Sequence, residues 1–302
     1  MPATVELLLQ ATKLLLQATV ARLLLQGYCC RRLFCHPLTG MSHGAEMPDG
    51  RLAVIGGGVY VAGRTVNHPV LTQVNSYDPA TGRWLTLPML EHARENFGGC
   101  CVSDRLRPAA AAGRVPEGEE PTEADTGWWR VVVAGGVGVV GGENNLCSAE
   151  AYGGGGQKWE QLPDMPHRAE GCGCAPLPGR RFAAIGGKGV SAAAVYSFVT
   201  ASWASLPPMS IARCYAGVGF VRGFIVVAGG TGDKMEVHSS VEAMPITGDG
   251  TDAASKPAVK PRWRALAALP EARRWCNMVP IHFSASDLAA LRAKKPAGKK
   301  KR

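Results

Sequence analysis

The chain has 302 residues, of which 46% are hydrophobic, and this is enough for a sizeable folded core. Its formal net charge of +9 belongs to the two ends, because residues 1–40 contribute +3 and residues 287–302 contribute +6. The remaining 22 basic and 22 acidic residues cancel, which argues against a nucleic-acid-binding face on the folded part.

Residues 1–40 repeat the motif Leu-Leu-Leu-Gln without proline or glycine from Ala3 to Gln26. This pattern predicts a leucine-rich helix. The charges of Glu6, Lys13 and Arg22 interrupt the apolar run, so we expect no membrane-spanning helix. Two roles remain open for this segment: an organelle-targeting helix, because it is basic and poor in acidic residues, or a docking helix.

A β-rich apolar segment that ends in two glycines occurs four times after residue 41. Runs of Val, Ile and Ala bounded by glycine and proline predict short buried strands. A glycine pair removes two Cβ atoms where such a strand ends, so another backbone can approach closely. The four segments are Arg51–Gly57, Arg130–Gly136, Arg181–Gly187 and Phe224–Gly230, with glycine pairs Gly56-Gly57, Gly135-Gly136, Gly186-Gly187 and Gly229-Gly230.

An aromatic pair follows three of these segments at a fixed spacing. A tyrosine precedes a tryptophan by seven positions, and a Leu-Pro pair and an arginine come after the tryptophan. The intervening turn residues predict a hairpin, and the aromatic rings are suited to filling the space between stacked sheets. The pairs are Tyr77 and Trp84, Tyr152 and Trp159, and Tyr196 and Trp203; the fourth unit has Trp263 alone, and the arginines are Arg94, Arg168, Arg213 and Arg273.

Each unit therefore supplies about four strands and cannot bury its own sheet face alone, whereas stacking like units in a ring buries all of them. The combined order of motifs closely resembles the kelch repeat of the galactose-oxidase-like β-propellers. The resemblance implies an all-β propeller over residues 41–283 with about four full blades and a partial one, in a small or incomplete ring. An acidic insertion at residues 103–127 interrupts the second unit.

By the same resemblance, the four arginines would crowd the mouth of the central channel and contact a protein partner. Arginine is suited to bidentate contacts with carboxylates. The alternative is structural: each arginine would bond loop carbonyls of its own blade. Cys100 and Cys174, six residues after Arg94 and Arg168, would face the same region as small apolar core residues.

Motifs for cofactors and metals are weak. Gly136, Gly138 and Gly141 fit the spacing of a dinucleotide fingerprint, but no helix start follows them. None of the ten cysteines forms paired C-x-x-C halves, and no two histidines have the spacing of a helical zinc site. We therefore expect no cofactor, no metal and no catalytic residues. With no convincing secretory signal, the thiols are expected to be reduced in a cytoplasmic or nuclear setting.

Residues 284–302 predict a short helix and a basic tail. The split cluster of Lys294, Lys295 and residues 299–302 (Lys299, Lys300, Lys301 and Arg302) is typical either of a nuclear import signal or of a solvated tail.

The functional expectation is a non-enzymatic interaction module, a scaffold or adaptor, whose loops and arginines bind a protein partner. Self-association to complete the ring is a further expectation. The alternative is an enzyme on the same scaffold, such as a copper-dependent oxidase or a sugar-modifying enzyme.

Overall fold

The computed structural model describes residues 39–40, 43–59, 69–104, 127–138, 145–153, 158–246, 261–276 and 278. The leucine-rich segment up to residue 38, most of the acidic insertion and the basic tail lie outside these residues. No helix in the described part is long and apolar enough to cross a membrane.

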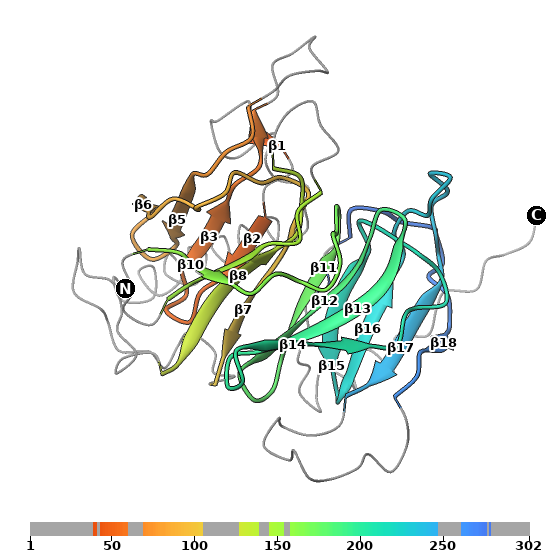
Figure 1. The fold of residues 1–302 in the computed structure, drawn as a ribbon. Helices are drawn as coiled ribbons and strands as arrows, with labels where there is room; N and C mark the ends of the chain where they lie inside the picture. Colours follow the sequence, from red (N-terminus) through yellow and green to blue (C-terminus); the bar gives the residue numbers. More distant parts are fainter. Residues whose placement is uncertain are drawn as a thin grey trace, which may run out of the picture.

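The described chain is built from four antiparallel sheets of four strands each, and no helix occurs within it (Figure 1). Each sheet uses strands that are close in sequence, as the repeated units predict. The first sheet contains β2 (His43–Glu46), β3 (Leu52–Ile55), β5 (Val74–Asp78) and β6 (Arg83–Leu87). The second contains β7 (Gly98–Ser103), β8 (Trp129–Ala134), β9 (Ala149–Tyr152) and β10 (Glu160–Leu162).

The third sheet contains β11 (Gly173–Leu177), β12 (Arg181–Gly187), β13 (Val190–Ser197) and β14 (Ser202–Leu206). The fourth contains β15 (Gly217–Val221), β16 (Phe224–Ala228), β17 (Val241–Pro245) and β18 (Arg264–Leu266). A short pair, β1 (Thr39–Gly40) with β4 (Gly58–Val59), lies beside the first sheet.

The four sheets are the blades of a β-propeller. Their first strands lie side by side, because β2 contacts β7, β7 contacts β11, and β11 contacts β15. No comparable contact joins β15 back to β2 within the described residues, so the four blades form an arc and not a closed ring. This confirms the expected all-β propeller of about four blades.

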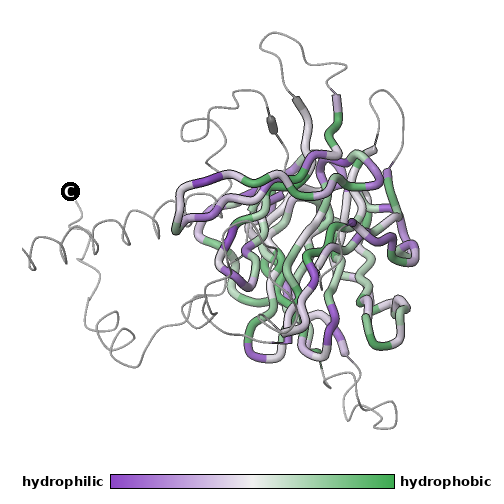
Figure 2. The backbone as a smooth tube through the Cα atoms, turned by 90° about the vertical axis from the view of Figure 1, so that its left-hand side faces the viewer, coloured by the Kyte–Doolittle hydropathy of each residue, from purple (hydrophilic) through white to green (hydrophobic). Residues whose placement is uncertain are grey.

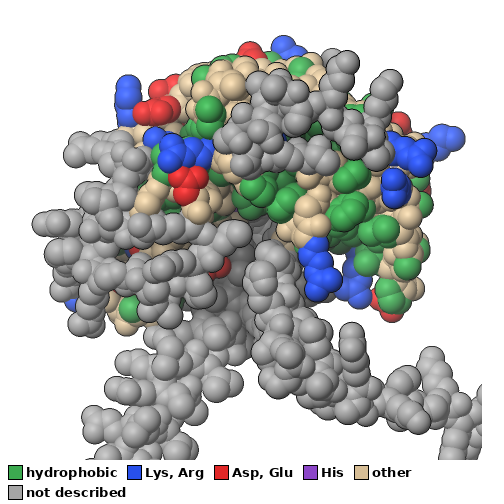
Figure 3. Space-filling view, turned by 90° about the horizontal axis from the view of Figure 1, so that it is seen from below, with side chains coloured by type: hydrophobic (Ala, Val, Ile, Leu, Met, Phe, Trp, Pro, Cys, Tyr) green, Lys and Arg blue, Asp and Glu red, His purple; other side chains and the backbone are tan. Residues whose placement is uncertain are grey.

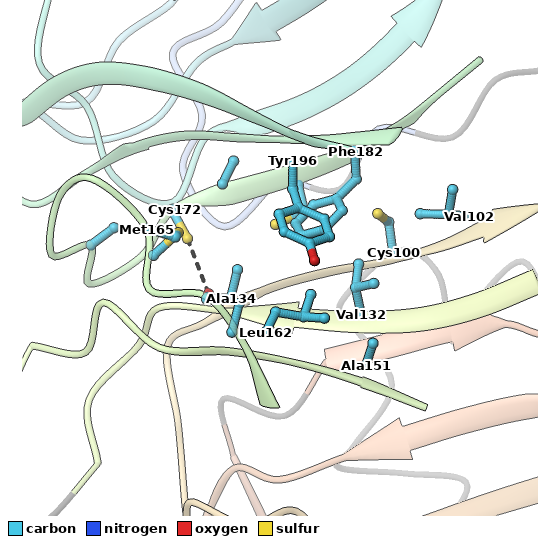
Figure 4. Close-up of a cluster of buried hydrophobic side chains, with 14 residues drawn as sticks. Cys100, Val102, Val132, Ala134, Ala151, Leu162, Met165, Cys172, Phe182 and Tyr196 are labelled. Carbon is cyan, nitrogen blue, oxygen red and sulfur yellow. Dashed lines mark hydrogen bonds between the residues drawn. The ribbon is translucent and has the colours of Figure 1, made fainter. Parts of the chain in front are cut away.

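Three hydrophobic clusters hold the blades together, one at each junction. Alternate residues of a strand point to opposite faces of its sheet, so each blade contributes to the cluster on either side. Between the second and third blades, Val102 and Val132 pack with Phe182 and Tyr196, all of them almost fully buried (Figure 4). Hydrophobic stretches run along the strands, and hydrophilic stretches gather in the turns (Figure 2).

The repeated aromatic pair forms the predicted hairpin. Tyr77 lies opposite Trp84 in β5 and β6, and Tyr196 lies opposite Trp203 in β13 and β14. In both pairs the ring centroids are 5.2 Å apart, a separation at which aromatic rings attract each other. The spacing of seven residues therefore sets a cross-strand contact within each of the first three blades.

The tryptophans also join each blade to the one before it. The indole Nε1 of Trp159 donates a hydrogen bond to the carbonyl of Pro88 at 2.9 Å. Trp203 donates to Pro163 and Trp263 to Pro207, both at 2.7 Å. The acceptor is each time the proline of the preceding Leu-Pro pair, so two motifs of the repeat have one shared role.

Replacing Trp159 by alanine should lower the free energy of unfolding by about 4 kcal/mol, because the buried ring and its hydrogen bond to Pro88 are both lost. Trp84→Ala is the matched control, since Trp84 holds the same position in the first blade but is 43% exposed. Urea denaturation should show a much smaller loss for the control. Equal losses would contradict the role of the tryptophan as an inter-blade contact.

Candidate functional site

The loops that lead from one blade into the next lie at one end of the arc. The strands of each sheet are antiparallel, so the chain reverses direction at every strand. The loop that enters a blade and the loop between its second and third strands therefore lie at the same end of the sheet. We call this the entry end; it lies at the top of Figure 1. The four arginines singled out in the sequence belong to the entry loops.

Arg94 is completely buried at this end. Its Nη1 donates to the carbonyls of Gly135 at 2.9 Å and Ser148 at 3.1 Å. Its Nη2 donates to Ser148 Oγ at 3.1 Å and to the buried carboxylate of Glu150 at 2.6 Å. The guanidinium thus bonds the glycine-pair loop and the third strand of its own blade.

Arg213 repeats this arrangement in the fourth blade. Its Nη1 donates to the carbonyls of Gly229 at 2.9 Å and Ser240 at 3.1 Å. Its Nη2 donates to Ser240 Oγ at 3.0 Å and to Glu242 Oε1 at 2.7 Å. These two arginines therefore take the structural role that was the alternative to partner contact.

The two glutamates also hold the entry loops. Glu150 accepts hydrogen bonds from the backbone N–H groups of Glu91 at 2.7 Å and His92 at 3.2 Å. Glu242 accepts one from the N–H of Ser210 at 3.0 Å. Each pair thus holds the entry loop and the glycine-pair loop of one blade together. The pairing and these hydrogen bonds offset the cost of burying the two charges, although the Nε of each arginine is buried without a partner. The sequence signal for the glutamates was the recurrent Ser-x-Glu at the start of the third strand.

Arg168 does not occupy the position of Arg94 and Arg213. In the entry loops of the second and fourth blades, the carbonyls of Arg94 and Arg213 accept a hydrogen bond from the second glycine of the preceding blade. In the entry loop of the third blade this acceptor is the carbonyl of Ala169, the residue after Arg168. Arg168 is exposed and donates to the carbonyl of Asn145 at 2.7 Å. Ala194 stands where the other two blades have their glutamate, so the third blade lacks both members of the ion pair.

Arg273 does hold the equivalent position, because its carbonyl accepts a hydrogen bond from Gly230 N–H at 2.7 Å. Its side chain is nonetheless exposed and lies 3.7 Å from the exposed carboxylate of Glu271. The structure thus buries two of the four arginines in ion pairs and leaves Arg168 and Arg273 at the surface. Contact with a partner stays a prediction for these two.

A ladder of backbone hydrogen bonds runs from blade to blade at the entry end. Gly171 N–H donates to the carbonyl of Asn96, Tyr215 to that of Gly171, and Trp275 to that of Tyr215, at 2.7, 2.8 and 2.9 Å. All four residues are left-handed, with φ between 54° and 71°. Tyr215 and Trp275 are residue types that rarely adopt this conformation, so the sequence carries no signal for their part of the ladder.

Two side chains of the ladder and two beside it form what we call the axial cluster: Tyr215 and Trp275 with Glu170 and Lys188. The rings of Tyr215 and Trp275 stack with centroids 3.8 Å apart. Tyr215 Oη donates to Glu170 Oε1 at 3.0 Å, and Lys188 Nζ lies 3.6 Å from Glu170 Oε2. Burial and the Glu170 carboxylate raise the pKa of Tyr215, so its phenol stays protonated at neutral pH and acts as a donor.

Cys100 and Cys174 lie in the core between the second and third blades, consistent with small apolar packing residues. Burial raises the pKa of the Cys100 thiol well above the usual value, and a hydrogen bond with Cys172, together with burial, does the same for the pKa of Cys174. The seven cysteines in the described part of the chain are free. Within the same residues, no group of three or more His, Cys, Asp or Glu side chains could hold a metal ion.

Comparison with known proteins supports the fold and goes no further. No family model matches the chain, and no curated protein matches it either. Among solved structures, that of YjhT is similar with a TM-score of 0.56 at 15% sequence identity. The match covers 79% of this chain and 73% of YjhT. The chain folds as a β-propeller.

Glu150→Gln should cost about 3 to 5 kcal/mol of stability, because it leaves the buried Arg94 guanidinium without a counter-charge. Glu160→Gln, on the neighbouring strand but exposed, is the control and should be nearly neutral. Replacing both members, as Arg94→Met with Glu150→Leu, should cost less than Glu150→Gln alone. Urea denaturation tests all three, and a loss below about 1 kcal/mol for Glu150→Gln would refute the role of the pair.

Proposed function

We propose that this chain is a kelch-type interaction module without enzymatic activity, and that it binds a protein partner through the entry end. The observation that carries the proposal is the buried ion pair beneath the entry loops. Arg94 with Glu150 and Arg213 with Glu242 bond the loop backbones from inside. Loops held in this way present their outward side chains at little entropic cost, as binding loops on a rigid scaffold do.

The outward side chains at the entry end, on the loops held by the ion pairs and on neighbouring loops, are of the kind found in interfaces. Met89 and Met235 are more than 60% exposed, and Trp275 is 46% exposed. Ile211 is also at the surface, and charged side chains of both signs surround these residues on the loops of this end, such as Arg168, Arg273, Asp233 and Glu271. Apolar anchors among charged groups of both signs suit a partner with an apolar contact surface and a polar rim.

The opposite end of the blades, seen in Figure 3, also exposes hydrophobic side chains among basic and acidic ones. There, Val199 is 68% exposed in the turn between β13 and β14. What favours the entry end is the loop support, which the two buried ion pairs supply there.

The test is quantitative mass spectrometry of proteins that co-purify with the chain. Met89→Asp combined with Ile211→Asp should reduce recovery of a specific partner at least tenfold, because charge enters the apolar contact. Val199→Asp at the opposite end is the matched control and should leave recovery unchanged. Unchanged recovery with the double variant, or equal loss with the control, would refute the entry end as the binding surface.

Metal analysis of the purified protein separates this function from the copper-oxidase alternative. Stoichiometric copper would contradict the interaction-module proposal as stated.

We propose that the protein is located in the cytoplasm or the nucleus, because the cysteines in the described part of the chain form no disulfide.

A further inference from the structure

The fourth blade exposes positions that are buried in the earlier blades. Val221, on β15, is 41% exposed, whereas Val102 and Leu177 at the same position of β7 and β11 are 0% and 4% exposed. These residues face the next blade in the second and third sheets. The face of the fourth sheet is therefore built like an inter-blade face but lacks its cover among the described residues.

The outer strand shows the same difference. Leu266 on β18 is 50% exposed, whereas the equivalent Leu87 and Leu162 are 4% and 7% exposed. Val226 on β16 is half-buried, whereas the equivalent Val132 is completely buried. Three strands of the fourth blade thus present apolar side chains that the earlier blades cover.

Beyond β18 the chain enters the position of a fifth first strand. Arg273 and Trp275 make the backbone hydrogen bonds that belong to an entry segment. Cys276 and Met278 then lie against Gly217 and Gly219, in the way that β11 lies against Gly98 of β7. The described residues therefore start a fifth blade.

We propose that the face formed by Val221, Val226, Leu266, Pro270 and Arg273 is a docking surface for a further blade of this same repeat. We call it the blade-4 face. The same face-to-face contact already occurs three times within the chain, so the repeat itself specifies what fits. The inference is independent of the partner proposed for the entry end.

The chemistry of the incoming blade follows from the established junctions. Its third strand carries a Ser-x-Glu whose carboxylate pairs with Arg273, as Glu150 pairs with Arg94. Its fourth strand carries a tryptophan whose Nε1 donates to the carbonyl of Pro270, as Trp159 donates to Pro88. Burial would turn the exposed Arg273 into the same buried, ion-paired guanidinium that Arg94 and Arg213 show.

One observation favours an added blade over a second copy of the chain. Head-to-tail pairing would bring β2 of the second copy to the place where Cys276 and Met278 already lie. Self-association, expected from the sequence as a way to complete the ring, is an outcome that the test below distinguishes.

The test inserts a copy of residues 100–165 after Met278 in the full chain, so that the register of the fifth first strand continues. This copy carries a duplicate of Glu150 and Trp159. Hydrogen exchange should show at least tenfold slower exchange of the β15–β18 amides than in the unextended chain, and the inserted strands should be protected as well. The first three blades are the internal reference and should keep their protection.

Two controls make the result specific. The same extension with Glu150→Gln in the inserted copy only, or with Arg273→Gln, should lose most of the added protection. An inserted copy that exchanges as unfolded chain, with β15–β18 unchanged, overturns the proposal. If sedimentation shows the unextended chain to be a dimer and hydrogen exchange shows that its blade-4 face is protected, these results also overturn the proposal, because the occupant is then a second copy.

Discussion

The architecture depends on one close contact that recurs in every described blade. The second glycine of each pair donates its N–H to a carbonyl in the entry loop of the next unit, at 2.7 to 3.0 Å. Both glycines have positive φ, and a Cβ on the first of them, as at Gly186 or Gly229, would lie 2.5 Å from the carbonyl oxygen of Arg213 or Arg273. Only glycine allows the two backbones to meet, and this contact sets the register between blades.

The other inter-blade contacts build on that register and are less uniform. The indole-to-proline hydrogen bond and the left-handed ladder join consecutive blades along the arc. The buried ion pair occurs in the second and fourth blades, and the third has Ala169 and Ala194 instead. Loss of both partners together is what electrostatics requires, because one buried charge left alone costs several kcal/mol. The entry loop that contains Arg168 therefore lacks the internal support of its neighbours.

The fold was predictable because its signals are local. Strand-like apolar runs and the seven-residue spacing from tyrosine to tryptophan each report on contacts within a single hairpin, and the glycine pairs mark where each second strand ends. The site was less predictable because it depends on contacts between segments far apart in sequence. The burial of Arg94 depends on Glu150, a residue far away in the sequence. The shift at Arg168 does leave a trace in the sequence, because Arg168 follows its tryptophan by nine residues and the other three arginines follow theirs by ten. Tyr215 and Trp275 have a left-handed backbone that their residue types do not indicate.

The glycine contact is tested most directly by comparing two glycine-to-alanine variants. Gly186 and Gly223 both have positive φ, at 72° and 86°, but a Cβ at Gly223 would meet no atom within 4 Å. Urea denaturation should show a loss of about 1 kcal/mol for Gly223→Ala, from backbone strain alone. Gly186→Ala should lose about 3 kcal/mol or more, since the Cβ also collides with the Arg213 carbonyl. Equal losses at the two positions would contradict the account.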